Sequence, residues 1–129
     1  MIVFKFGPLS KDELAIRFDA KGAREFISAI LHLFDGKNGE EVLDCFKRSS
    51  NSVDAARIKM KRDGQDSLEI KGNELLLCMS DDALEYAEFM LEKFLKEGDF
   101  SPSEFWEVSR KGRRYDTQVF FLNFSSFDS

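Results

Sequence analysis

The sequence predicts a single α+β domain: an antiparallel or mixed sheet of five to six strands with two main helices packed on it and a short third helix near the C-terminus. Two segments place apolar residues at helical spacing, and the segments around them have the alternation or the β-branched and aromatic content of strands. The length of 129 residues is that of one domain, which we assign to residues 1–129. Fourteen phenylalanines in a 43% hydrophobic composition supply one dense core.

The N-terminal third predicts two strands followed by the first main helix. Residues 2–6 are β-branched and aromatic and end at Gly7-Pro8, and residues 14–18 alternate in polarity. The period then becomes helical, after Asp19 as the N-cap and before Gly36 as the stop. The apolar positions of this helix are Ala23, Phe26, Ile27, Ile30, Leu31 and Phe34.

The middle third predicts a meander of strands. Residues 40–48 fit either a short helix or a strand, and the sequence leaves this open. Residues 56–61 alternate in polarity, residues 68–70 form the next strand, and residues 75–79 form an apolar strand. The turns between them are Asp63-Gly64 and Gly72-Asn73.

The C-terminal third predicts the second main helix, a short helix and a last strand. Ser80 caps a helix over residues 81–97 that ends at Gly98. Residues 101–104 read Ser-Pro-Ser-Glu, a capping box that predicts a short helix through Val108. Residues 117–124 form the final strand, and we expect the tail 125–129 to be frayed.

The two main helices resemble each other. Ala23-Arg24-Glu25-Phe26, with Ile30-Leu31 and Phe34 behind it, matches Ala83-Leu84-Glu85-Tyr86, with Met90-Leu91 and Phe94 behind it. Each segment follows a predicted strand. Either a strand–helix unit is duplicated, or two amphipathic helices have converged on the same pattern.

Charge and cysteine content limit the classes of function. A net charge of −5 and a pI near 5.0 argue against nucleic-acid binding, which needs an excess of cations. Cys45 and Cys78 form no CxxC motif and read as reduced core thiols. The N-terminus has neither the basic start nor the long apolar run of a signal peptide, and no segment reaches transmembrane length. We expect a cytoplasmic protein without membrane contact.

No catalytic, metal or cofactor site is predicted. His32 is the single histidine and falls on the polar face of its helix, without a nucleophile or an orienting group signalled nearby. A structural zinc site needs about four thiolate or imidazole ligands, and the chain has three such residues. Phosphate-binding glycine motifs are missing from the sequence. We therefore expect a protein that is not an enzyme.

The helix over residues 81–97 carries the candidate partner-binding residues. Its acidic ridge consists of Asp81, Glu85, Glu88 and Glu92. Like charges four residues apart destabilise a helix, and Phe89 lies beside the ridge, away from the core face. Such a surface suits a basic protein partner, because charge steers the encounter and the ring anchors it. The alternative is an ordinary solvated face with Phe89 covered by Phe105 and Trp106.

Two clusters of cations form a second candidate feature. Arg57, Lys59 and Lys61 share one strand face, and residues 110–114 form a basic loop. Outward Lys and Arg commonly protect a strand edge from aggregation. The loop could hold an anion, but the net negative charge of the chain opposes nucleic-acid binding.

Three stretches together resemble a known group of proteins. They are DAKGAREF at 19–26, LEIKGNEL at 68–75, and DALEYA at 82–87 through EGDFSP at 97–102. In size, acidity and layout the chain resembles the immunity proteins of bacterial contact-dependent growth inhibition and related polymorphic toxin systems. The resemblance implies a cytoplasmic antitoxin, a stoichiometric inhibitor that covers the active site of a cognate toxin, often a basic nuclease; it transfers no individual residue. Residue patterns alone also allow a small ligand-sensing or regulatory domain with a Phe-rich pocket.

Overall fold

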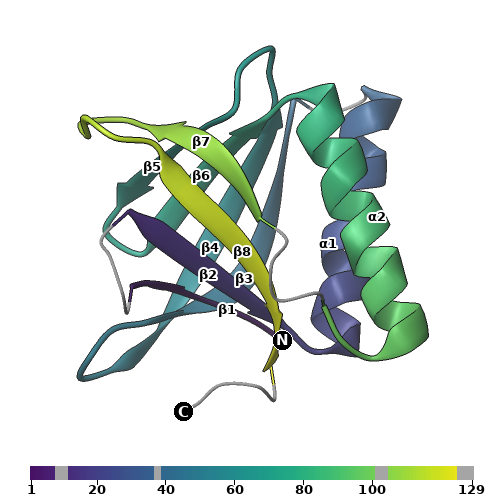
Figure 1. Cartoon of the computed structure of the whole chain (residues 1–129), viewed down its shortest axis with the longest axis horizontal. Coiled ribbons are helices and arrows are strands. Elements are labelled where there is room, and N and C mark those ends of the chain that lie inside the picture. The colour runs from purple at the N-terminus through teal and green to yellow at the C-terminus, as the bar shows by residue number, and fades with distance from the viewer. Residues whose placement is uncertain (8–11, 37–38, 101–104, 125–129) are drawn as a thin grey trace.

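The computed structural model describes residues 1–7, 12–36, 39–100 and 105–124, and within them the chain forms a closed β-barrel with two helices (Figure 1). The strands are β1 (Ile2–Phe6), β2 (Glu13–Phe18), β3 (Glu40–Arg48), β4 (Val53–Arg62), β5 (Ser67–Lys71), β6 (Glu74–Met79), β7 (Phe105–Arg110) and β8 (Thr117–Asn123). The helices are α1 (Ala20–Asp35) and α2 (Asp81–Glu97). Around the barrel the order is β1-β2-β8-β7-β5-β6-β4-β3.

The prediction of an open sheet of five to six strands is wrong, because two segments add strands and the sheet closes. Residues 40–48 are the strand β3, which settles the choice that the sequence left open. The short helix expected through Val108 is instead β7, which pairs with β8 from Phe105 opposite Phe120 to Val108 opposite Thr117. The capping box at 101–104 and the tail 125–129 lie outside the described residues. At β7, pairing with β8 overrides a local helix signal.

The two main helices were predicted correctly, and their caps explain why. Asp19 accepts a hydrogen bond from the Gly22 N–H at 2.7 Å and also pairs with the N-terminal ammonium group. Gly36 ends α1 with a φ of 71°, a left-handed conformation that favours glycine. Ser80 and Gly98 cap α2 in the same way. These signals lie within a few residues of each helix end, so the sequence alone reveals them.

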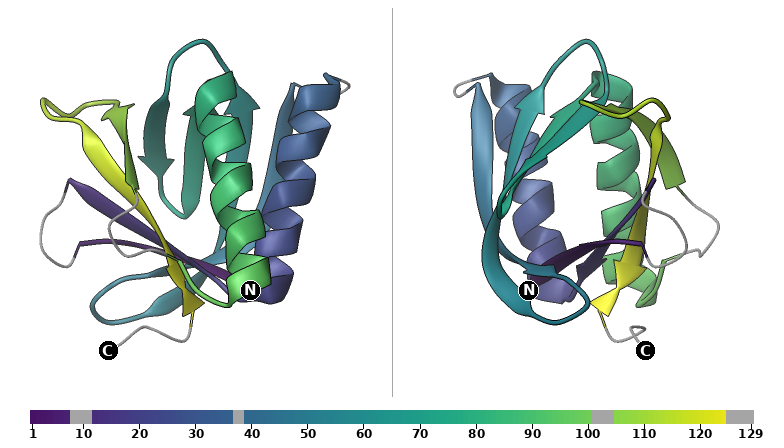
Figure 2. Two further views of the ribbon diagram at one scale, coloured as in Figure 1. Left: turned by 45° about the vertical axis from the view of Figure 1, so that its right-hand side comes forward. Right: turned by 90° about the vertical axis from the view of Figure 1, so that its left-hand side faces the viewer.

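The two helices lie side by side across one end of the barrel. In the right-hand view of Figure 2 the strands form a ring and both helices lie behind it. The interior is filled by fully buried aromatic rings, with Phe18 at 4.9 Å from Phe121 and at 5.4 Å from Phe26, centroid to centroid. Phe4, Phe18, Phe26 and Phe121 thus belong to the packed core.

The fold repeats itself. In the first half, β1 pairs with β2 and β3, and β3 pairs with β4. In the second half, β5 pairs with β6 and β7, and β7 pairs with β8. The parallel pairs β2–β8 and β4–β6 join the two halves. The buried helix positions match at constant spacing: Gly22 with Ala83, Ala23 with Leu84, Phe26 with Ala87, Ala29 with Met90, Ile30 with Leu91, and Leu33 with Phe94. The structure therefore contains a duplicated ββαββ unit. The sequence comparison aligned Ala23 with Ala83, which is one residue away from the structural match of Ala23 with Leu84.

Candidate protein-binding surface

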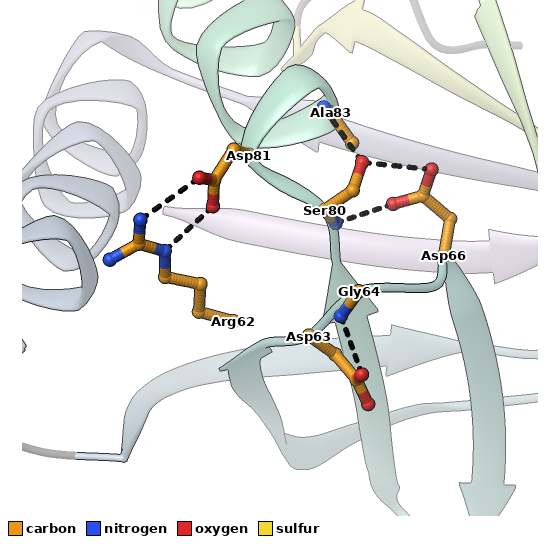
Figure 3. Close-up of polar contacts among 7 residues, drawn as sticks. All are labelled: Arg62, Asp63, Gly64, Asp66, Ser80, Asp81 and Ala83. Carbon is orange, nitrogen blue, oxygen red and sulfur yellow. Dashed lines mark hydrogen bonds and ion pairs between the residues drawn. The ribbon is translucent and has the colours of Figure 1, made fainter.

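The first turn of α2 is held by side chains from the loop before β5. The Asp66 carboxylate accepts hydrogen bonds from the Ser80 backbone N–H at 2.6 Å and from the Ser80 hydroxyl at 3.2 Å (Figure 3). The Ser80 hydroxyl oxygen in turn accepts from the Ala83 N–H at 3.2 Å. This network anchors the start of α2 to the loop before β5.

Asp81, the first member of the acidic ridge, is engaged within the chain. Arg62, at the end of β4, donates from Nε at 2.6 Å and from a terminal nitrogen at 2.9 Å to the two carboxylate oxygens of Asp81 (Figure 3). The same guanidinium lies over the Phe34 ring at 5.2 Å. Hydrogen bonding to Arg62 lowers the pKa of Asp81. Its charge is thus neutralised locally, and it contributes less to a binding surface than the sequence pattern indicated.

Glu85, Glu88 and Glu92 make no ion pair within the described part of the chain, and we call these three residues with Phe89 the α2 surface. Glu85 and Glu92 are exposed, and Glu88 is half-buried. Burial raises the pKa of Glu88, and so do a hydrogen bond to Glu92 and the charges of Glu92 and Glu85. The three carboxylates therefore crowd one another without an internal cation to compensate them.

The Phe89 side chain is 59% exposed, as the helical period predicts. Trp106, a residue expected to cover it in the alternative interpretation, instead contacts Tyr86 at 6.4 Å and Phe121 at 4.9 Å. Tyr86 precedes Phe89 by three residues on α2, and its ring contacts Trp106 of β7 and not the Phe89 ring. The Phe105 side chain lies outside the described part. An exposed aromatic ring thus stands beside unpaired carboxylates.

Leu31 is a surface residue that the sequence pattern placed wrongly. Its spacing put it in the apolar stripe of α1, but its side chain is 47% exposed. In the repeated unit Leu31 occupies on α1 the position that Glu92 occupies on α2, so it faces outward beside the neighbouring helix. Helical spacing could not detect this, because Leu31 borders the stripe and only the packing of α1 shows which border is covered.

We expect Glu88→Gln to stabilise the fold at pH 7 by about 0.2–0.5 kcal/mol, the size of one like-charged helix pair. Because the pKa of Glu88 is raised in the folded state, its ionised form opposes folding at neutral pH. The unmodified protein regains this stability as pH falls through the raised pKa and Glu88 binds a proton. Urea unfolding at pH 7 and at about pH 4 should show the advantage of the variant shrinking at the lower pH; a constant difference would contradict this.

His32 is exposed, as predicted, and its Nδ1 lies 3.1 Å from the Glu41 carboxylate. The two residues lie on opposite walls of a groove of about 370 Å³ between α1 and β3. In the described residues no group of three or more His, Cys, Asp or Glu side chains could hold a metal ion. The side chains around His32 therefore form a polar groove.

The cations of the two basic clusters are mostly matched by acids of the barrel. Arg57 pairs with Glu74 at 3.4 Å and Lys59 with Glu40 at 3.5 Å. In the loop after β7, Lys111 pairs with Glu69 and Arg113 with Asp12. Arg110, the last residue of β7, lies over the Phe6 ring at 4.2 Å. These cations therefore make contacts within the fold.

Both cysteines are free thiols, and burial raises the pKa of Cys45 to about 12. A thiol of this kind stays protonated and unreactive at neutral pH, which agrees with a core role.

In the described chain neither helix has the length and apolar content needed to cross a membrane. No protein-family model, no curated protein and no solved structure matches this chain.

Proposed function

We propose that this protein is an immunity-type inhibitor that acts in the cytoplasm. It binds a cognate basic toxin, such as a nuclease, through the α2 surface and covers the toxin's active site. One observation carries the proposal. Glu85, Glu88 and Glu92 crowd together without a counter-ion among the residues that the structure describes, beside a phenylalanine ring that is 59% exposed. This arrangement costs stability in the free protein, and a basic partner would relieve it.

The geometry suits the two stages of association. Unpaired carboxylates on an exposed helix face attract a basic protein over about a Debye length, which accelerates the encounter. After contact, the Phe89 ring can enter a pocket of the partner, where a buried aromatic anchor contributes most of the affinity. Leu31 is a second exposed apolar side chain, on the adjacent helix α1.

The class of function is tested with the toxic C-terminal domain of the large secreted protein that we expect in the neighbouring reading frame. Co-expression of this chain should restore growth of cells that produce the domain, and the purified pair should form a 1:1 complex. Association should slow as salt rises, because the attraction is screened. Cells that die despite co-expression, or a neighbouring frame without such a domain, would contradict the proposal.

A further inference from the structure

β3 has a strand partner on one side only over much of its length. It pairs with β4 from Glu40 to Arg48, but with β1 only at Val3 opposite Phe46 and Phe4 opposite Lys47. Residues 40–45 thus have a free edge in the part of the chain that is described. Figure 2 shows this half of β3 alongside α1. Exposed strand edges are templates for the addition of another strand.

Hydrogen bonds in the neighbouring turns show which backbone groups lie on this edge. The Ser49 N–H donates to the Ser52 carbonyl at 2.9 Å, which makes the odd-numbered residues of β3 the ones that bond to β4. Val42 and Asp44 therefore direct their N–H and C=O groups away from β4. Among the described residues no other group makes a hydrogen bond to these main-chain atoms.

The free edge borders the groove of about 370 Å³ whose α1 wall includes Glu25 and Ser28. The repeated half of the fold shows why this groove is open. Tyr86 occupies on α2 the position of Glu25 on α1, and its ring contacts Trp106 at 6.4 Å. The Tyr86–Trp106 pair thus fills the space beside β7. Glu25 has no such aromatic partner, and the space beside β3 stays accessible.

The charges of the groove select its occupant. Glu25 and Asp44 make no ion pair in the described regions, and Arg57, directly across from Asp44 on β4, is taken by Glu74 at 3.4 Å. We propose that an extended protein segment bearing Lys or Arg side chains adds to β3 as a further strand. Its backbone bonds to Val42 and Asp44, and its side chains alternate between the two faces of the sheet. A cationic side chain on the outer face lies beside the Asp44 carboxylate, and one that points toward α1 lies beside Glu25. This site lies on the other flank of α1 from the α2 surface and does not depend on the proposed inhibitory function.

The test uses a fluorescent peptide in which Lys-Lys pairs alternate with Val-Val pairs, so that both faces of the added strand carry lysine. Binding is measured by anisotropy and by amide hydrogen exchange of the protein. Saturable binding should slow exchange at the amides of Val42 and Asp44 and leave those of Glu41 and Leu43, already bonded to β4, unchanged. A matched peptide with Glu in place of Lys should bind at least about tenfold more weakly, because it faces like charges.

Two variants at one position separate the backbone from the side chain. Val42→Pro removes the N–H and should weaken peptide binding about tenfold, the value of one hydrogen bond at the upper end of its range, whereas Val42→Ala keeps the N–H and should bind nearly as the unmodified chain does. Glu85→Lys with Glu88→Lys should leave peptide binding within about twofold, which distinguishes this site from the α2 surface. If Val42→Pro does not fold, hydrogen exchange on the unmodified chain decides. The proposal would be overturned if saturating peptide left the exchange rates of the Val42 and Asp44 amides unchanged. It would also be overturned if these amides became protected without peptide as the protein concentration rises and the chain dimerises.

Discussion

Glu85→Lys combined with Glu88→Lys is expected to weaken binding to the cognate toxin about a hundredfold, mainly through slower association. Both carboxylates lack an internal counter-ion among the described residues, so their charge is available to a partner. Two lysines in their place would face a basic surface with like charge. Surface plasmon resonance at several salt concentrations measures the effect, and the difference between variant and unmodified protein should narrow as salt rises.

A control variant with the same change in net charge makes this result specific. Glu107→Lys with Asp116→Lys places two lysines at exposed positions of β7 and the loop after it, outside the α2 surface. This control should bind nearly as the unmodified protein does. An equal loss in both variants would mean that the partner responds only to net charge, and no loss in either would show that the α2 surface is not the contact.

Phe121→Ala is expected to lower the free energy of unfolding by about 3–5 kcal/mol, the range found for large-to-small changes of buried aromatic residues. Phe121 is 1% exposed, and its ring lies within 4.9–6.0 Å of four other aromatic rings. Those rings are Phe18, Phe26, Phe100 and Trp106. Because they come from both halves of the fold, the cavity left by alanine would be felt by strands and helix alike.

Guanidinium unfolding measures this change, with Tyr115→Ala as the control. Tyr115 is 65% exposed, so its loss should alter stability by no more than about 0.5 kcal/mol. A loss below about 1 kcal/mol for Phe121→Ala would contradict a closely packed interior. It would favour instead the ligand-sensing alternative, in which the phenylalanines line a pocket.

The sequence predicts much of the local structure because the deciding contacts are short in range. Asp19 and Ser80 bond to amides three residues ahead, and Gly36 and Gly98 adopt the left-handed conformation just past each helix. The strands with clear alternation were also placed correctly. Each of these features depends on neighbours within one or two turns of chain.

Two segments show where local signals fail. The helix signal before β7 was overridden by pairing with β8, which supplies backbone bonds and burial at Val108. Residues 40–48 carry an ambiguous pattern because the outer face of β3 mixes Val42 and Phe46 with acids. Only the β4 hairpin decides that this segment is a strand.

For the candidate site, helical periodicity predicts from the sequence alone that Glu85, Phe89 and Glu92 share the outer face of α2, and their exposure agrees with it. Tertiary structure alone decides that Arg62 neutralises Asp81, since these residues meet only when the end of β4 is brought to the start of α2. Closure of the barrel is likewise a tertiary outcome. It depends on backbone pairing between residues far apart in the sequence, such as Val3 with Phe46. These residues meet only after the intervening helix has folded back on the sheet, and no local sequence pattern encodes such a long-range contact.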